Sequence, residues 1–368
     1  KDWEQKRVAY SQKYPNLAES LVQIQQRQLP TGWDKDLPVF PADTKGLASR
    51  DSSGKVLNLL GKNIPWLMGG SADLSPSTKT RMTFEGVGDF TAKDRSGRNL
   101  HFGVREHAMG SILNGMALSK VRAYGSGFLI FSDYMRPTLR LSALMEIPTI
   151  FIFTHDSIGV GEDGPTHQPI EQIASLRAIP GLITIRPADA NEVVEAWRFI
   201  MRLRHEPVAL ILSRQALPTV DRSVFAPASG LAKGAYILVD APDGKPDVLL
   251  LATGSEVSLC VEAYEKLKLS GIKARVISMP SWELFEQQPL AYRQSVIPPN
   301  VTARVSVEFA STFGWAKYVG ENGATIGMTT FGASAPLKSL AKHFGFATDN
   351  IIAAVQKQVK NINPNINA

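Results

Sequence analysis

The sequence has few of the residues and patterns that would place it in a special class of protein. Its 368 residues include a single cysteine, Cys260, which excludes an intramolecular disulfide and a zinc site built on cysteines. Cys260 lies in a helical pattern, GSEVSLCVEAYEKL, and is predicted to be a small buried residue. No apolar run approaches the roughly 18 residues of a membrane span, and no signal-peptide pattern is found, so the sequence gives no reason to expect a membrane location or export. We therefore expect a cytoplasmic protein with no membrane partner.

Blocks of like charge are also missing. The net charge is +6 and the isoelectric point is about 9.3, but the lysines and arginines are scattered along the chain. The basic and aromatic ladder of a nucleic-acid surface does not occur, so no nucleic-acid partner is expected. The positive excess suits anionic small molecules, or it is ordinary surface composition.

Shifts in composition along the chain predict a linker and two domains. Residues 1–34 are polar and helix-prone, are broken by prolines, and contain too few apolar residues to fold alone, so they are predicted to be an interdomain linker. Because the first residue is Lys1 rather than methionine, we expect the sequence to continue something longer. The turn-rich stretch 214–234 indicates a boundary, and the two domains are predicted to be 35–222 and 223–368.

Both domains alternate strand and helix patterns. Residues 182–214 read as strand, turn, helix and strand, with Asp189 or Asn191 as the helix N-cap. Residues 147–155, IPTIFIFTH, have the pattern of a buried strand. The predicted fold class is therefore α/β, with two domains that are each a mostly parallel β-sheet flanked by helices. Later strands are predicted at 247–254, 273–279, 303–309 and 325–332. A helix is predicted to follow, with Ser334 near its cap and Pro336 in its first turn.

The segment 154–171, THDSIGVGEDGPTHQPIE, is the most unusual part of the sequence, with two of the six histidines, four acids and three glycines. His155 and Arg214 fall at the carboxyl ends of predicted strands, where open parallel sheets bind ligands. A metal site is disfavoured because regular ligand spacing is missing, and a dinucleotide site because Pro165 interrupts the glycines. A polar loop that binds substrate hydroxyls and phosphate is favoured. A solvated connection without a function remains an alternative.

Three further segments contain residue types that occur in functional sites, but each can also be explained by a purely structural role. A glycine-serine turn after an apolar run is a candidate ligand site or a strand-to-helix cap. An Arg-Glu-His sequence at the start of a helix is a candidate site, or its glutamate caps the helix. An aromatic stripe at i, i+3 and i+6 is a cofactor pocket or, more often, part of a core. The residues are Asp73 and Ser77 in GGSADLSPS, Glu106 in HFGVREHAMG, and Phe128, Phe131 and Tyr134 in GSGFLIFSDYM.

Taken in order, these segments resemble the transketolase family. The resemblance runs from Arg50 through the segments above to LSRQ at 212–215 and GMTTFGASAP at 327–336, and the 154–171 loop is highly specific to that family. It covers essentially the whole chain. It implies a thiamine-diphosphate-binding fold, the pyrimidine-binding (Pyr) domain, followed by the transketolase C-terminal domain. It also implies a homodimer with shared active sites, and we expect the helix after Glu106 to form part of the interface.

The resemblance implies a role for each matched residue. Glu106 matches the catalytic glutamate, which shares a proton with a pyrimidine nitrogen of thiamine diphosphate, and a buried carboxyl with a raised pKa suits that role. The aromatic residues match a pocket for the pyrimidine ring, and Asp73 matches an acid near the cofactor. Catalysis is assigned to Glu106, His155 and His167. Substrate binding is assigned to a phosphate clamp of Arg50, Ser77, His155 and Arg214, and to Asp163 and His167 on the sugar hydroxyls.

The implied reaction is the transfer of a two-carbon ketol unit from a ketose phosphate to an aldose phosphate, as in the pentose phosphate pathway and the Calvin cycle. The family anchors the cofactor's diphosphate through Mg²⁺ with a G-D-G motif, which this sequence lacks. No metal ligand is therefore assigned to this chain. We expect an N-terminal domain to be missing and the chain to be inactive alone, either as a truncated or proteolysed enzyme or as one subunit of a split enzyme.

Three other functions remain open. Dihydroxyacetone synthase has the same site and a formaldehyde acceptor. The β-subunit of a 2-oxoacid dehydrogenase has the same domain order, but the phosphate clamp argues against it. A non-catalytic interaction module of the same fold is disfavoured because every matched polar position is present.

Overall fold

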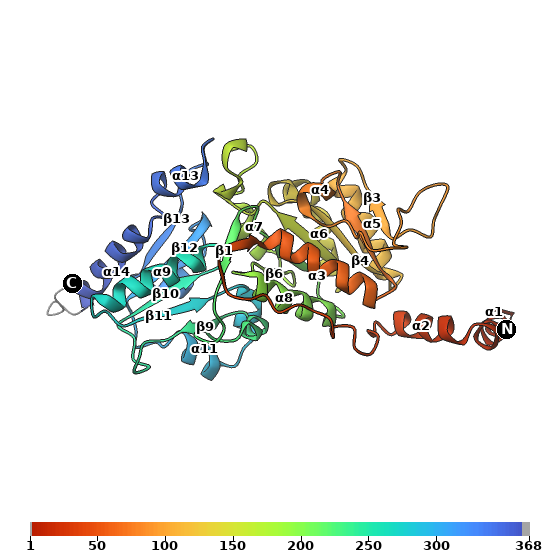
Figure 1. The fold of residues 1–368 in the computed structure, drawn as a ribbon, viewed down its shortest axis with the longest axis horizontal. Helices are drawn as coiled ribbons and strands as arrows, with labels where there is room; N and C mark the ends of the chain where they lie inside the picture. Colours follow the sequence, from red (N-terminus) through yellow and green to blue (C-terminus); the bar gives the residue numbers. More distant parts are fainter. Residues whose placement is uncertain (1, 363–368) are drawn as a thin grey trace.

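The computed structural model describes residues 2–362, which begin with a helical arm. Helices α1 (Asp2–Lys13) and α2 (Pro15–Gln25) bury none of their residues and extend away from the rest of the molecule (Figure 1). Pro15 starts α2 because the first position of a helix needs no N–H donor. The helix-prone character predicted for this segment is confirmed, and its role as a linker stays a prediction.

The six-stranded lobe is built on a sheet of order β3-β2-β4-β5-β7-β6, in which all pairings are parallel. Helices separate the strands along the chain, as the alternating sequence pattern predicts. The strands are β2 (Leu67–Ser71), β3 (Asn99–His101), β4 (Arg122–Phe128), β5 (Ile150–Thr154), β6 (Ile183–Ile185) and β7 (Val208–Ile211). The helices are α3 (Ser49–Asn63), α4 (Ser75–Thr78), α5 (Glu106–Leu118), α6 (Ser132–Leu144), α7 (Gln172–Arg177) and α8 (Ala190–Arg202), with 3-10 turns η1 (Leu129–Phe131) and η2 (Ile158–Asp163).

The central strand β5 explains why both faces of this sheet are covered. Ile150 and Ile152 pack in one buried cluster with residues of α8, whereas Phe151 and Phe153 pack in a second cluster with residues of α6. Successive side chains of a strand point to opposite faces, so an uninterrupted apolar strand needs a layer of helices on each side. The predicted buried strand within 147–155 is confirmed.

The start of α8 resolves the choice between two candidate N-caps. The carboxylate of Asp189 accepts a hydrogen bond from the Glu192 backbone N–H at 2.8 Å, which makes Asp189 the N-cap. The amide of Asn191 is engaged elsewhere, with the backbone N–H and C=O of Phe40, both at 2.9 Å. This second pairing ties the segment before β1 (Asp43–Ala48) to the body of the lobe.

The five-stranded lobe follows, with a sheet of order β13-β12-β10-β11-β9. Only β9 runs antiparallel to its neighbour, so the predicted α/β class with mostly parallel sheets is confirmed. Between the lobes, β8 (Ala216–Thr219) pairs antiparallel with β1. The strands are β9 (Tyr236–Val239), β10 (Val248–Ala252), β11 (Ala274–Ser278), β12 (Arg304–Ser311) and β13 (Ala324–Met328). The helices are η3 (Ala228–Lys233), α9 (Glu256–Leu269), α10 (Trp282–Glu286), α11 (Leu290–Val296), α12 (Ala316–Val319), α13 (Leu337–His343) and α14 (Thr348–Ile362).

The segment after β13 differs from the prediction. The strand expected over 325–332 ends at Met328, and α13 begins at Leu337 with Pro336 as its N-cap residue. Ser334 does not cap the helix, because its hydroxyl donates a hydrogen bond to the backbone C=O of Glu162, 2.5 Å away in the other lobe. A hydrogen bond between the two lobes therefore takes the place of the predicted helix cap.

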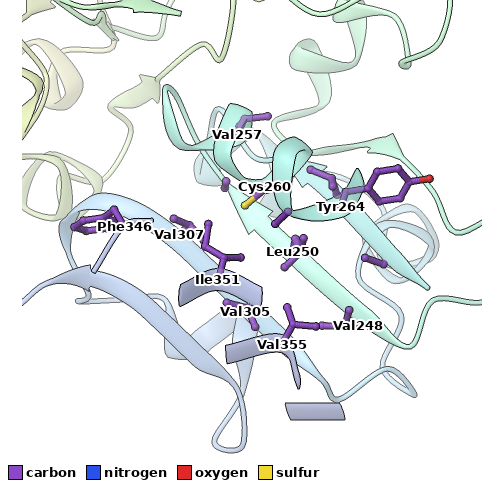
Figure 2. Close-up of a cluster of buried hydrophobic side chains, with 14 of the residues drawn as sticks. Val248, Leu250, Val257, Cys260, Tyr264, Val305, Val307, Phe346, Ile351 and Val355 are labelled. Atoms are coloured by element: carbon purple, nitrogen blue, oxygen red, sulfur yellow. The ribbon is translucent and has the colours of Figure 1, made fainter. Parts of the chain in front are cut away.

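The core of the five-stranded lobe contains the single cysteine. Cys260 of α9 packs between β10 and α14, next to Leu250 and Ile351 (Figure 2). Its burial, which was predicted, raises the pKa of the thiol above its ordinary value. Among the helices of residues 2–362, none combines the length and the apolar character that a membrane span requires.

Replacing Leu250 by alanine should lower the free energy of unfolding by about 2–5 kcal/mol, because Leu250 is fully buried and its truncation leaves a cavity. Urea denaturation followed by circular dichroism measures the change. Leu269→Ala is the matched control, since Leu269 is 89% exposed and its loss should change the stability by less than about 0.5 kcal/mol. Equal effects of the two substitutions would contradict the assignment of Leu250 to the core.

Candidate active site

The candidate residues gather at one edge of the six-stranded sheet. Phe128 is the last residue of β4, His155 directly follows β5, and Arg214 lies in the segment that leaves β7. Asp73 lies between β2 and α4. Parallel strands end at the same edge, and ligands of open α/β sheets bind outside that edge. The strand order therefore brings together side chains that are far apart in the sequence.

Arg50 and His155 are in direct contact. Nη1 of Arg50 lies 3.3 Å from Nε2 of His155 and donates a hydrogen bond to the backbone C=O of Ser77 at 2.9 Å. The other ring nitrogen of His155, Nδ1, lies 2.8 Å from the hydroxyl of Thr154. Nε of Arg50 is buried and has no partner among the described residues. The guanidinium thus keeps an unused donor beside the imidazole.

His155 is held in an unusual state. Its backbone has a φ of 60°, in the left-handed region that few non-glycine residues adopt, and its side chain is 3% exposed. Burial, followed by the positive charges of Arg50 and Arg214 and by His167, lowers the pKa of His155 to about 3. The imidazole is therefore neutral at physiological pH, where it can both donate and accept a hydrogen bond.

The charge around His155 is unbalanced. Within residues 2–362, the ion pairs to carboxylates include neither Arg50 nor Arg214. Arg214 is exposed, and it is close enough to Arg50 and His155 to lower the pKa of each. Asp51 offsets part of the charge of Arg50, but two guanidinium groups without an ion pair among the described residues, beside a neutral imidazole, favour an anionic ligand with several oxygen acceptors.

An aromatic row borders this group. The rings of Phe128 and Phe131 are nearly parallel, with centroids 6.0 Å apart and an interplanar angle of 8°. Tyr134 continues the row and is 67% exposed, whereas Phe128 is buried at 8% exposed, so the row runs from the core to the surface. The imidazole of His155 stacks on Phe128 at 3.6 Å, and His167 meets Phe131 edge-on at 5.7 Å. Both histidines of the 154–171 loop therefore contact the aromatic row.

Other candidate residues lie outside this contact group. Glu106 is the first residue of α5, and its side chain is 8% exposed, as the predicted buried carboxyl requires. The N-cap residue of α5 is Arg105, and no side chain in the described part of the chain caps the helix. Asp73 and Asp163 are exposed, and Asp73 has a left-handed φ of 61°. Within residues 2–362, no group of three or more His, Cys, Asp or Glu side chains is placed to hold a metal ion.

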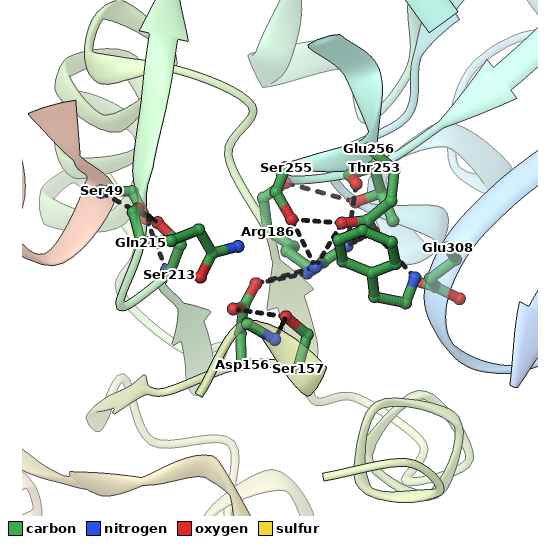
Figure 3. Close-up of polar contacts among 12 residues, drawn as sticks. Ser49, Asp156, Ser157, Arg186, Ser213, Gln215, Thr253, Ser255, Glu256 and Glu308 are labelled. Carbon is green, nitrogen blue, oxygen red and sulfur yellow. Dashed lines mark hydrogen bonds and ion pairs between the residues drawn. The ribbon is translucent and has the colours of Figure 1, made fainter. Parts of the chain in front are cut away.

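Sequence reasoning missed Arg186, whose side chain binds Asp156 of the 154–171 loop and so holds the loop in place. Its guanidinium donates to the Asp156 carboxylate at 2.9 Å and to the backbone C=O of Thr253 at 2.8 Å, and it pairs with Glu256 (Figure 3). All three charged side chains are buried. Burial alone would lower the pKa of Arg186, but the charges of Glu256 and Asp156 outweigh burial and raise it.

The signal for Arg186 was present in the sequence. Arg186 directly follows β6, in the same relation that His155 has to β5. The rule that strand ends carry functional side chains would have identified it. Its position next to the loop residue Asp156 connects the five-stranded lobe to the residue beside His155.

A second buried ion pair joins the lobes nearby. Both Nη atoms of Arg177 in α7 donate to the Glu308 carboxylate of β12, at 3.0 and 2.8 Å. Glu308 also accepts a hydrogen bond from the indole of Trp315 at 2.7 Å, and the guanidinium lies 3.8 Å from the centre of the Trp282 ring. A two-pronged Arg–carboxylate pair of this kind fixes orientation as well as distance.

Stability should fall in acid partly because of His155. Unfolding restores its ordinary pKa of 6.5, so below that pH the unfolded chain binds a proton that folded His155 accepts only near its pKa of about 3. His155→Gln should therefore reduce the loss of stability between pH 6.5 and about 4, by at most about 1.4 kcal/mol per pH unit.

Urea unfolding at a series of pH values measures this slope. His205→Gln, at an exposed position, is the matched control and should leave the slope as it is in the unsubstituted chain. The same slope in the His155→Gln variant and in the unsubstituted chain would show that His155 titrates normally in the folded state.

Comparison with known proteins identifies the family that has these two lobes. Residues 45–220 match the family model described as "Transketolase, pyrimidine binding domain", and residues 234–347 match "Transketolase-like TK C-terminal domain". The transketolase of Halalkalibacterium halodurans is 49% identical over 98% of this chain and 54% of its own length, and that of Bacillus subtilis is 48% identical over 96% and 53%. The chain thus spans about half the length of these curated relatives.

Solved structures agree with the sequence relatives. The transketolase from Leishmania mexicana superposes with a TM-score of 0.92 and 41% identity, over 100% of this chain and 53% of that one. A structure described as "Split gene transketolase, inactive beta4 tetramer" has a TM-score of 0.67 and 25% identity, over 86% of this chain and 99% of that one. From the two family models together with these relatives, we conclude that the chain belongs to the transketolase family and has its pyrimidine-binding and C-terminal domains.

Proposed function

We propose that this chain forms part of a thiamine-diphosphate-dependent transketolase, which transfers a two-carbon ketol unit from a ketose phosphate to an aldose phosphate. The observation that carries the proposal is the contact between Arg50 and His155 with Arg214 nearby, at the end of an aromatic row. It puts an anion-binding group next to a surface for a flat ring. The relatives named transketolase support the same conclusion.

The proposed domain organisation follows the two lobes. Residues 1–34 are the interdomain linker, 35–222 the Pyr domain and 223–368 the C-terminal domain. Such an enzyme would act in the cytoplasm. The alternative of a dihydroxyacetone synthase has no supporting observation, and a panel of aldose phosphate and formaldehyde acceptors separates the two activities.

The substrate is proposed to bind next to the aromatic row, with its phosphate at the clamp. Arg50 offers an Nε that has no partner among the described residues, and Arg214 offers an exposed guanidinium, which suit the several oxygens of a phosphate dianion. His155 and Ser77 are assigned to the same clamp, and the neutral imidazole, whose Nε2 accepts from Arg50, orients that guanidinium. Asp163 and His167 are assigned to the sugar hydroxyls, because a carboxylate and an imidazole can distinguish hydroxyl positions by hydrogen bonding.

The residues present fit the pyrimidine end of thiamine diphosphate. Phe128 and Phe131 offer a stacked apolar wall, with Tyr134 beyond it, and Glu106 offers a buried carboxyl at the start of α5. When bound, the cofactor supplies the electron sink that ketol transfer needs. Glu106 would share a proton with a pyrimidine nitrogen, and the phenylalanines would exclude water from the ring. Asp73 is assigned to the cofactor's surroundings, and the Mg²⁺ and diphosphate ligands to the N-terminal part that the relatives have in addition.

A homodimer with shared active sites is proposed through α5 and α6. These two helices pack against each other and leave large apolar side chains exposed on their outer surface. Apolar groups of this size on neighbouring helices are typical of protein interfaces. The residues are Ile112, Leu118, Leu141 and Leu144, with exposures of 50, 54, 44 and 69%.

The purified chain should show no ketol transfer alone, and activity should appear when the N-terminal part of a relative is supplied with thiamine diphosphate and Mg²⁺. A coupled assay with a ketose phosphate and an aldose phosphate measures turnover, and calorimetry measures cofactor binding. Turnover by the chain alone would refute the need for the N-terminal part. Tight cofactor binding without turnover in the completed enzyme would refute the transketolase assignment.

Glu106→Gln in the completed enzyme should lower kcat by about 100-fold or more, because the amide has no acidic proton to share. The KM for sugar phosphate should change by less than about threefold, since Glu106 lies outside the phosphate clamp. Arg214→Ala is the contrasting variant and should act mainly on KM. Steady-state kinetics with each variant give both constants, and normal turnover in Glu106→Gln would remove the catalytic assignment.

A further inference from the structure

Gln168 connects the 154–171 loop to the five-stranded lobe. Its Nε2 donates one hydrogen bond to the backbone C=O of Gly161, at 2.8 Å, and another to the backbone C=O of Ala333, at 2.9 Å. Gly161 belongs to η2 of the same loop, whereas Ala333 lies between β13 and α13. The side chain is 1% exposed, so water does not compete for these bonds.

The chemistry of this position requires a carboxamide. Two carbonyl oxygens face one atom, and an amide –NH₂ has the two hydrogens that satisfy both. The other amide atom, Oε1, is buried and has no partner among the described residues. A glutamate would place a carboxylate oxygen against two carbonyls, and a methionine would leave both carbonyls unsatisfied.

Gly332 makes room for this amide. A Cβ atom at position 332 would lie 1.7 Å from Oε1 of Gln168, a distance that no side chain can occupy. The backbone at Gly332 therefore lies so close to the side-chain amide of Gln168 that only a glycine fits there. The absence of a side chain at Gly332 is part of the Gln168 site.

A second contact holds the same part of the loop. The hydroxyl of Ser334 donates to the backbone C=O of Glu162 at 2.5 Å, and a Cβ at Gly164 would lie 3.2 Å from Ser334 Cβ. Helix α13, which follows Ser334, packs on η2. Glu162 and Gly164 are the two neighbours of Asp163, and Gln168 is the neighbour of His167. Each proposed hydroxyl-binding residue therefore lies next to an anchored position.

We propose that Gln168 and Ser334 are positioning residues that fix Asp163 and His167, so that the C-terminal domain determines which sugar hydroxyls the site accepts. This inference rests on the proposed function, because it concerns the substrate selection of the same site. The loop contains Gly159, Gly161 and Gly164, whose backbone freedom would otherwise allow many conformations. Its base is fixed by Asp156 and Arg186, and its far end by Gln168.

The test uses the completed enzyme and Gln168→Met, which keeps the side-chain length and removes both donors. The ratio of kcat/KM for two ketose phosphates that differ in hydroxyl configuration should fall by about tenfold or more, because small misplacements of binding groups cost large factors. Inhibition by inorganic phosphate should change by less than about twofold, since the phosphate clamp does not contact Gln168. A general loss of folding would weaken both selectivity and phosphate inhibition. A loss of selectivity with unchanged phosphate inhibition therefore identifies a positioning role.

Gln288→Met is the matched control. Gln288 also donates through Nε2 to a backbone carbonyl, that of Leu284 at 3.0 Å, but within the five-stranded lobe and away from the loop. This variant should keep the selectivity of the unsubstituted enzyme. Ser334→Ala, which removes one exposed hydroxyl, should lower selectivity in the same direction as Gln168→Met and by a smaller factor.

A second measurement is independent of activity. Hydrogen exchange on this chain should show the amides of residues 161–168 exchanging about tenfold faster or more in Gln168→Met, with α8 unchanged. Unchanged exchange, or unchanged selectivity in an active Gln168→Met enzyme, would overturn the inference. Absence of ketol transfer in the unsubstituted completed enzyme would instead overturn the proposed function, and the exchange data would still decide whether Gln168 holds the loop.

Discussion

The guanidinium of Arg186 lies between Asp156 of one lobe and Glu256 of the other, with almost no access to water. Buried charges are tolerated only when they remain paired, because removing one partner leaves an uncompensated charge in a medium of low polarity. The lobes therefore cannot separate at this point without a large loss of stability. Because Asp156 follows His155 directly, the same constraint that joins the lobes also sets the position of the imidazole in the candidate site.

The state of His155 follows from that arrangement. A residue with a left-handed backbone persists only where its surroundings fix it, and here the Asp156 anchor lies on one side and the Thr154 hydroxyl on the other. The buried imidazole then meets Arg50 without taking up a proton itself. Positive charge is concentrated on the guanidinium groups, and the imidazole contributes direction rather than charge. Such a division of tasks suits recognition of a phosphate group.

Much of the fold could be predicted from the sequence because it depends on local patterns. The buried strand in 147–155, the capped helix after Asp189 and the location of His155 at a strand end all follow from side-chain periodicity and capping. The contacts of Arg186 and Gln168 could not be predicted, because they join segments that are distant in the sequence. Ser334 shows the difference: its local pattern indicated a helix cap, but its hydroxyl bonds across the lobes.

Gly332 and Gln168 lie 164 positions apart in the chain, yet the space that one leaves empty is the space that the other's amide fills. They form a single packing unit that spans both lobes. A bulkier residue at 332 becomes acceptable only together with a shorter one at 168. A chimeric enzyme joined near residue 222 divides this pair, and where its parents differ at positions 168 and 332 we expect a clash at the loop even when each half folds correctly.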